Sequence, residues 1–235
     1  MVDKPAGKSL APAPRGQDVN AARGGTAVEH TTARDYAAYR AAFAGRAMPF
    51  AFVDLDLLDE NARQVAAQIG AKRARIASKS VRSVALLRRM LASDDRFQGI
   101  MCFTAREAVY LAEQGFDDLL IGYPTCGAAD LDAVARACAN GARITLMVDC
   151  PEHIALAERA ARQHNLRLPL CLDMDMSLDL PGLRFGVWRS PVRSLEQARP
   201  LVERIAASAD VTLDGIMGYE AQIAGLGDRV PGQWA

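Results

Sequence analysis

The sequence predicts an α/β protein of the (β/α)8 TIM-barrel type in which about six of the barrel strands are present. Six short apolar or β-branched runs alternate with segments of helical period, which is typical of a parallel sheet. These runs are apolar throughout, as in strands covered on both faces, so the sheet is either open and doubly wound or closed into a barrel. No G-x-G-x-x-G follows the first run and polar residues recur where the runs end, which favours the barrel.

The N-terminal part of the chain precedes this pattern. Residues 1–32 are rich in Pro, Gly and Ala and have no sustained apolar period, so we expect a disordered tail there and the partial barrel in residues 33–235. Tyr36, Tyr39 and Phe43 keep helical spacing and predict a short helix.

An extended apolar run is expected next, in PFAFVDLDLL. The following segment, DENARQVAAQIGAK, has the pattern of a helix that Asp56 or Asp59 could cap and Gly70 could end.

The expected barrel strands are ARIASKS, QGIMCFT, DDLLIGYP, ARITLMVD, LPLCLDMD and VTLDGIMGYEA. Helical period marks SVALLRRMLAS, AREAVYLAEQG and DLDAVARACANG between them. The carboxyl ends of barrel strands form the active-site face, so side chains distant in the sequence should converge there. The polar residues at those ends are Lys79, Thr104, Tyr123, Asp149, Asp175, and Tyr219 with Glu220.

Composition excludes several classes of function. Lys plus Arg and Asp plus Glu are 28 each, so nucleic acid is not an expected partner. No run approaches the roughly 18 uncharged apolar residues that would span a membrane, and we expect a cytoplasmic protein. The five cysteines are widely spaced without a C-x-x-C pair and are expected to be reduced and buried. The three histidines share no metal-ligand spacing and are expected at the surface.

Lys79 ends the first strand, in RIASKSVRS. Ser80 could cap the next helix, which would put the ammonium near a positive helix end. Strand alternation puts Arg75 on the same face, and Arg82 lies one helical turn later. Cationic, partly desolvated surroundings lower the pKa of a lysine and free its amine for Schiff-base chemistry with a carbonyl. A lysine that forms a salt bridge at the barrel rim is the alternative.

Two carboxylates share one face of the fifth strand, Asp173 and Asp175 in LCLDMD. They could bind a metal, act as acid and base, or balance cations within the barrel, and charge balance with Arg75 and Arg184 is favoured. An unpaired buried carboxylate is costly, so an inward-pointing Asp173 should have an arginine partner.

These segments together resemble a known family. The order runs from VDLDLLDENARQVAAQI through RIASKS, IMCFTAREAVYLAEQGFDDLLIGYP, LMVD and a D-x-D strand followed by LRFGV, to GIMGYEAQIAG. It is similar to the alanine-racemase-like barrel of the fold-type III pyridoxal-phosphate enzymes, and most similar to the branch of D-threonine aldolase, D-serine dehydratase and amino acid deaminase/aldolase. The resemblance covers about residues 49–228.

The resemblance implies a role for several residues. Lys79 matches the lysine that holds pyridoxal phosphate as an internal aldimine and then acts as a base at Cα. Arg184, in an Arg-x-Gly-Val pattern, matches the arginine near the phenolic oxygen of the cofactor, with Arg189 as its alternative. Asp173 takes the place of the acidic group that orients this arginine.

Tyr219 matches a tyrosine near the cofactor at the end of the sixth strand. Arg75 and Thr104 complete the expected set of cofactor-binding residues.

The implied activity is that of a pyridoxal-phosphate-dependent lyase, an aldolase or deaminase, on a D- or β-hydroxy amino acid. The branch usually has Pro-His-x-Lys-Thr-His-Lys around the lysine, whereas residues 76–82 read IASKSVR and lack both histidines, which leaves substrate and reaction open. The alternatives are an amino acid racemase, a non-catalytic barrel of the pyridoxal-phosphate homeostasis type, and a Schiff-base aldolase without cofactor.

Length separates this chain from the family. The family barrel has eight strands, a glycine-rich phosphate loop in its later part, and a C-terminal β domain that supplies metal ligands and closes the site across a dimer. This chain stops at RVPGQWA, soon after the sixth strand. We therefore expect a truncated barrel without the β domain or the ligands for a divalent metal, and a homodimer when complete. Whether the short chain is active is left open.

Overall fold

The computed structural model of the chain describes residues 35–181 and 183–220. The chain divides after Phe52 into two compact units, each of which is described by itself. The predicted tail at residues 1–32 lies outside the described residues.

The described part of the first unit is a short helix followed by an aromatic cluster. Helix α1 (Tyr36–Ala42) confirms the helical spacing of the aromatic residues, and the Asp35 side chain caps it by accepting from the Ala38 N–H at 2.8 Å. The ring of Phe43 lies 4.9 Å from Phe50 and 4.4 Å from Phe52, measured between ring centres. These contacts bury aromatic surface locally.

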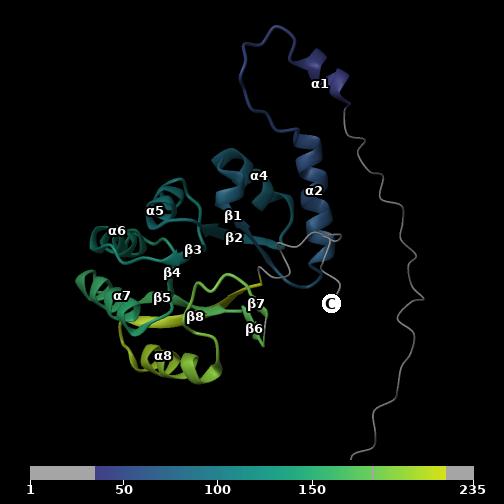
Figure 1. Cartoon of the computed structure of the whole chain (residues 1–235). Coiled ribbons are helices and arrows are strands. Elements are labelled where there is room, and N and C mark those ends of the chain that lie inside the picture. The colour runs from purple at the N-terminus through teal and green to yellow at the C-terminus, as the bar shows by residue number, and fades with distance from the viewer. Residues whose placement is uncertain (1–34, 182, 221–235) are drawn as a thin grey trace, which may run out of the picture. The chain divides into compact units, whose positions relative to one another are not determined.

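The second unit is built on one parallel sheet of six strands in the order β1-β2-β3-β4-β5-β8. Its strands are β1 (Ala74–Ala77), β2 (Phe97–Cys102), β3 (Leu119–Pro124), β4 (Ile144–Val148), β5 (Leu168–Asp175) and β8 (Val211–Tyr219). Its helices are α2 (Leu55–Gln68), α3 (Ser78–Val81), α4 (Val84–Ser93), α5 (Ala105–Glu113), α6 (Ala128–Ala139), α7 (Pro151–Gln163) and α8 (Leu195–Ala207). Figure 1 shows α4 to α8 along the outer side of the curved sheet.

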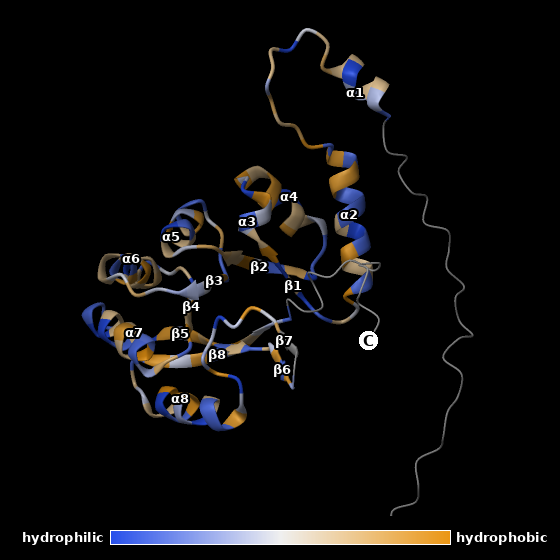
Figure 2. Ribbon diagram, viewed as in Figure 1, coloured by the Kyte–Doolittle hydropathy of each residue, from blue (hydrophilic) through white to orange (hydrophobic). Residues whose placement is uncertain are grey.

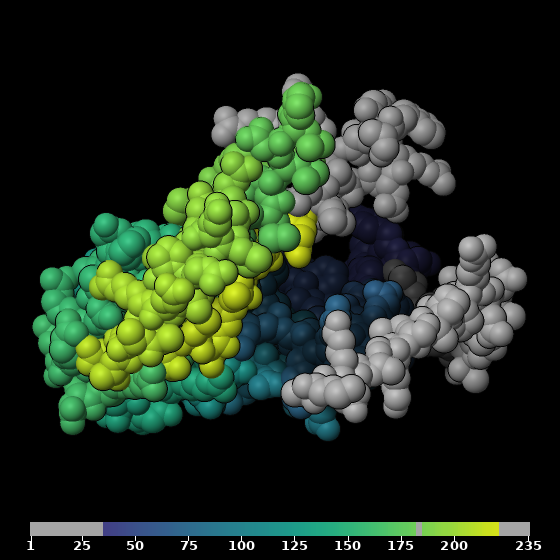
Figure 3. Space-filling view, turned by 90° about the horizontal axis from the view of Figure 1, so that it is seen from below, coloured from purple at the N-terminus to yellow at the C-terminus, as the bar shows by residue number. Residues whose placement is uncertain are grey.

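All six predicted strands are therefore confirmed, and they form a curled part of a barrel (Figure 1). Strands β1 and β8 are the two ends of the sheet, and within the described ranges no other strand pairs with their outer edges. Figure 3 shows a hollow between the yellow residues of β8 and the blue residues near the start of the sheet. About six barrel strands were expected, and the described sheet has six.

The core lies between the sheet and its helices. All five residues of β4 are buried, and Ile100, Leu119 and Leu170 are fully buried in neighbouring strands, as expected for strands covered on both faces. Figure 2 shows that the covering helices carry both hydrophobic and hydrophilic residues. Burial of their apolar stripes against the strands is the main stabilisation of the sheet, at about 25 cal/mol per Å².

The expectation of an extended run in PFAFVDLDLL was wrong from Leu55 onward, where α2 begins. Asp54, rather than Asp56 or Asp59, caps this helix, because its Oδ1 accepts from the N–H groups of Asp56 and Leu57 at 3.0 and 3.3 Å. The helix then buries Ala62 and Ala66, four positions apart, on one face. Gly70 follows the helix with φ +61°, as its predicted end requires.

The segment after β1 also differs from expectation. The strand ends at Ala77, and residues 78–81 form the single helical turn α3. Ser83, not Ser80, caps α4, because its Oγ accepts from the Leu86 N–H at 3.4 Å. Arg82 has a left-handed backbone with φ +49°, which separates the turn from α4.

The segment after Asp175 forms a hairpin that lies outside the main sheet. Strands β6 (Leu178–Leu180) and β7 (Leu183–Phe185) form a separate antiparallel pair. This hairpin is inserted between β5 and the loop that leads to α8.

The described helices include none that is long and apolar enough to cross a membrane.

Candidate functional site

Lys79 lies at the carboxyl edge of the sheet, in the helical turn that follows β1. Ser78 fixes this turn to the neighbouring strand by donating from its Oγ to the Met101 carbonyl at 3.1 Å. The Lys79 Nζ lies 5.7 Å from the ring centre of Phe103 and 6.0 Å from that of Tyr123. No hydrogen bond or ion pair joins its ammonium to another residue in the described part of the chain, so the salt-bridged alternative is not what the structure shows.

Arg75 and Arg82 do not form the cationic cluster that the sequence suggested around this amine. Arg75 binds Asp118, which precedes β3, through an ion pair of 2.9 Å and a further bond to the Asp118 carbonyl. It therefore engages the amino end of β3, whereas Lys79 faces Tyr123 at the carboxyl end of the same strand. Arg82 donates from Nε to the Lys79 carbonyl at 2.9 Å.

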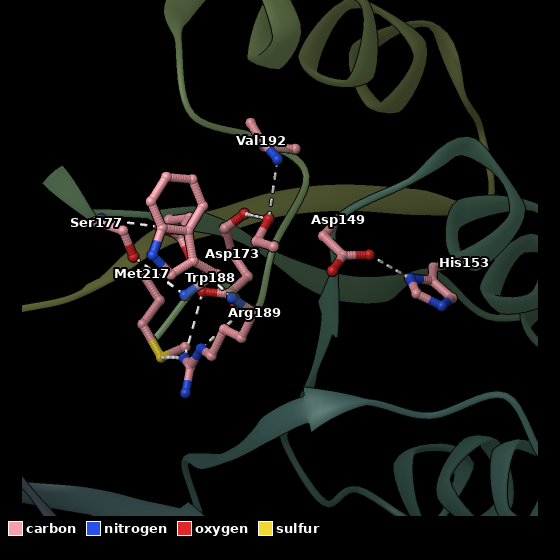
Figure 4. Close-up of polar contacts among 10 residues, drawn as sticks. Asp149, His153, Asp173, Ser177, Trp188, Arg189, Val192 and Met217 are labelled. Carbon is pink, nitrogen blue, oxygen red and sulfur yellow. Dashed lines mark hydrogen bonds and ion pairs between the residues drawn. The ribbon is translucent and has the colours of Figure 1, made fainter. Parts of the chain in front are cut away.

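Asp173 has the arginine partner that its burial required, and this partner is Arg189. The Asp173 side chain is only 3% exposed, and the Arg189 Nε lies 3.1 Å from its Oδ2 while Nη2 donates to Oδ1 at 3.3 Å (Figure 4). Burial raises the pKa of Asp173, and the hydrogen bond and charge of Arg189 oppose that rise. Arg184 lies in β7, where its backbone pairs with Asp179, and its side chain is outside the described residues.

The Arg189 guanidinium lies between two tyrosines at strand ends. Its central carbon is 5.2 Å from the ring centre of Tyr219, at the end of β8, and 5.4 Å from that of Tyr123, at the end of β3. Its Nη2 also contacts the Met217 sulfur at 3.7 Å. Both distances to the rings are within the range of cation–π attraction, worth about 0.5–1 kcal/mol each at such exposed sites.

Tyr123 is the residue that connects these groups. Its ring lies within 6.0 Å of the Lys79 Nζ, within 5.4 Å of the Arg189 guanidinium and 5.5 Å from the Phe103 ring, which it meets edge to face. Tyr123 was recognised as a strand-end residue but was not among the expected cofactor-binding residues. Its position at the end of β3 was the available signal, because strand ends from different parts of the chain meet at this edge.

Thr104, which was expected in the cofactor-binding set, caps α5. Its Oγ1 accepts from the Glu107 N–H at 3.2 Å, and the Glu107 carboxylate accepts from the Phe103 N–H at 2.6 Å. These two bonds resemble a capping box, except that Glu107 accepts from the residue before the N-cap, and they fix the backbone that carries Phe103 beside Lys79.

Asp175 holds the loop that carries Arg189. Its Oδ1 accepts from the Ser177 N–H at 2.8 Å and its Oδ2 from the Arg189 N–H at 2.7 Å. Gly186 approaches the same loop so closely that an added Cβ would lie 2.2 Å from the Ser177 Oγ. Burial alone would raise the pKa of Asp175, but the hydrogen bonds from Ser177, Arg189 and Ser190 outweigh it and leave the pKa lowered.

We expect Asp175→Asn to lower the free energy of unfolding by about 1–3 kcal/mol, because an amide can accept only one of the two N–H bonds. Because the pKa of Asp175 is lower in the folded protein, its ionised carboxylate stabilises the fold at pH values above the ordinary pKa of 3.8. This contribution is lost as the pH falls through the folded-state pKa. Urea unfolding of both proteins across an acid pH series should therefore show a difference that shrinks toward low pH. A difference that stays constant at every pH would contradict this account, and the exposed Asp179→Asn serves as the control.

Comparison with known proteins identifies the family of this chain. Residues 53–234 match the family described as alanine racemase, N-terminal domain. The chain is 28% identical over 181 residues to 3-hydroxy-D-aspartate aldolase of Paracoccus denitrificans, covering 76% of this chain and 44% of that protein. The chain thus spans less than half the length of the curated relatives that it matches.

Two solved structures have the same fold at low sequence identity. D-threonine aldolase from Filomicrobium marinum matches with a TM-score of 0.58 and 23% identity, over 70% of this chain and 42% of that one. D-threo-3-hydroxyaspartate dehydratase from Delftia sp. HT23 matches with a TM-score of 0.59 and 21% identity, over 74% of this chain and 44% of that one. Because the family match extends over most of the second unit, the chain belongs to the alanine racemase N-terminal domain family, the barrel of the fold-type III pyridoxal-phosphate enzymes.

Proposed function

We propose that this chain is the lysine-bearing barrel part of a pyridoxal-phosphate-dependent lyase, an aldolase or deaminase that acts on a D- or β-hydroxy amino acid. The observation that supports this most strongly is the position of the Lys79 amine. It lies at the carboxyl edge of the sheet beside two aromatic rings and makes no ion pair with the described residues. The names of the relatives support the choice of hydroxy amino acids as substrate class.

The side chains at this edge fit pyridoxal phosphate by their chemistry. An amine without an ionic partner can react with an aldehyde, and a guanidinium can neutralise a phenolate or a phosphate. Lys79 and Arg189 supply these two groups on the same edge, and Tyr123 lies close to both. When bound, the cofactor supplies an electron sink for a bond broken at the substrate Cα.

Each side chain then has a defined task. Lys79 would hold the cofactor and carry a proton at its Nζ. The rings of Phe103 and Tyr123 would exclude water from one side of that amine, since they lie edge to face at 5.5 Å. Arg189 would bind an anionic oxygen, and Asp173 would keep its guanidinium oriented, as their two contacts already do.

The roles of Arg184, Arg75 and Thr104 remain predictions, as does self-association of a complete form. Arg189 is the arginine that we assign to the cofactor in place of Arg184, because Asp173 binds it.

The substrate class can be tested with the chain supplied with pyridoxal phosphate and each of D-threonine, D-threo-3-hydroxyaspartate and D-alanine. We expect release of a carbonyl product from the two hydroxy amino acids and none from D-alanine. Racemisation of D-alanine would instead identify a racemase. Cofactor binding without turnover of any of the three would contradict a lyase in this chain and favour a carrier role.

A further inference from the structure

A group of three potential ligands lies at the start of α7, outside the site described above. Asp149 follows β4, Cys150 occupies the N-cap of α7, and His153 is in the first turn of that helix. Each offers one ligand atom, and these three atoms all lie within 4.8 Å of one another. Backbone geometry produces this convergence, because the strand end and the first helical turn face each other across the N-cap.

The contact between Asp149 and His153 leaves the His153 Nδ1 without a hydrogen bond to the described residues. The Asp149 Oδ1 lies 2.8 Å from the His153 Nδ1 (Figure 4), and Asp149 is buried, with 8% of its surface exposed. The distance is that of an ion pair, but the buried Nδ1 makes no hydrogen bond of acceptable geometry with any described residue. A buried nitrogen without a directed partner is costly, and a cation coordinated by this nitrogen together with the carboxylate oxygen would satisfy both.

The other partly buried histidine gives a direct comparison. His164 lies 2.7 Å from Asp132, and there the Nε2 makes a proper hydrogen bond to the carboxylate, which Arg136 also binds. In that surface pair the histidine nitrogen next to the carboxylate is hydrogen-bonded to it. The histidines were expected at the surface, and the side chains of His153 and His164 are partly exposed there, at 17% and 22%.

Space for an ion and its remaining ligand is present beside the group. Asp149 and Cys150, but not His153, line an open pocket of about 320 Å³ between the start of α7 and one side of α8, with Arg204 at its edge. Arg204 forms an ion pair with Glu158 at 3.0 Å, so it does not neutralise the Asp149 carboxylate. A cation could therefore enter from solvent and keep a water molecule as its fourth ligand.

We propose that Asp149, Cys150 and His153 form a binding site for a divalent cation of the zinc type. One oxygen, one sulfur and one nitrogen ligand are a donor set that suits Zn²⁺, and three protein ligands leave one of its four positions open. Binding releases the Cys150 thiol proton to solvent, and the carboxylate and thiolate then balance the two charges of the ion. This site goes beyond the proposed lyase function and does not depend on it.

Cobalt is the probe that tests this site in the full chain, because a thiolate ligand gives Co²⁺ a sulfur-to-metal charge-transfer band. We expect one Co²⁺ per chain with this band, and its displacement by Zn²⁺. Cys150→Ser should abolish the band while keeping the fold, since serine is a better N-cap than cysteine. His153→Gln should weaken Zn²⁺ binding at least tenfold, which is the lower limit found for loss of even an outer-shell partner.

Two matched variants serve as controls. His164→Gln removes the histidine of the completed ion pair, and Cys126→Ser removes an exposed thiol, so neither should change the band or the affinity. Absence of a charge-transfer band in the wild-type chain would overturn the proposal. So would a band that persists in Cys150→Ser, or zinc affinity that His153→Gln leaves unchanged in a protein with wild-type circular dichroism.

Discussion

Replacement of Lys79 by alanine is expected to abolish covalent binding of pyridoxal phosphate. Lys79 offers the only lysine amine at the carboxyl edge within the described residues, and its Nζ faces the rings of Phe103 and Tyr123. After borohydride reduction, peptide mass spectrometry should find the pyridoxyl group on Lys79 in the wild-type chain and at background level in Lys79→Ala. If Lys79 also transfers a proton, any lyase activity should fall by about 10²–10⁴-fold.

Lys72 provides the matched control for this experiment. It is an exposed lysine that lies before β1, seven positions earlier in the sequence. Lys72→Ala should keep full labelling of Lys79. Labelling that is equal in the two variants, or that persists in Lys79→Ala, would remove the basis of the proposed function. The zinc site would be unaffected by that result, because none of its three ligands contacts Lys79.

Replacement of Arg189 by alanine is expected to lower both stability and cofactor binding. Asp173 has a side chain that is 3% exposed, and Arg189 supplies its described ion pair. Removing one member of a buried pair leaves an uncompensated charge and costs about 3–5 kcal/mol. Because the Arg189 side chain is itself 22% exposed, we expect the lower end of this range, measured as the loss in unfolding free energy in urea.

The loss should depend on pH in a defined direction. The pKa of Asp173 is already raised by burial, and loss of the Arg189 charge raises it further. A raised carboxyl pKa in the folded protein lowers its stability at pH values above that pKa. This loss of stability disappears as the pH falls below the ordinary pKa of 3.8. Arg189→Ala should therefore approach wild-type stability in acid.

A double variant separates the buried charge from simple loss of packing. Asp173→Asn combined with Arg189→Ala should be less destabilised than the sum of the single variants, with a coupling of about 0.5–3 kcal/mol. Strict additivity would show that the pair is not coupled. Arg193→Ala is the control, since Arg193 lies 3.9 Å from Asp179 in an exposed pair worth at most about 1 kcal/mol. Pyridoxal-phosphate binding by Arg184→Ala and Arg189→Ala then decides which arginine serves the cofactor.

The strands and most helices of the second unit could be predicted because each carries its own signal. Continuous apolar runs specify buried parallel strands, and a 3.6-residue period specifies the helices that cover them. Prediction failed where a short segment suits two alternative structures about equally well. The run VDLDLL suits an extended or a helical backbone, and the Asp54 cap selects the helix. Ser80 and Ser83 both precede an apolar helix, and the left-handed backbone of Arg82 selects Ser83.

The candidate site was predicted in part. An arginine partner for Asp173 was predicted because burying an unpaired charge is costly, and the structure contains such a partner in Arg189. Which arginine meets it depends on the path of the inserted hairpin and on Asp175, whose two oxygens bind Ser177 and Arg189.

The sequence by itself determined a parallel barrel-type sheet, a lysine close after the first strand and a buried carboxylate on the fifth. These properties arise from residue type and periodicity within short segments. Only the tertiary structure decided that Tyr123 links Lys79 to Arg189 and that a cysteine, an aspartate and a histidine converge at the start of α7. The first grouping depends on the register of neighbouring strands and on packing between distant segments, whereas the second depends on the backbone angles where β4 passes into α7.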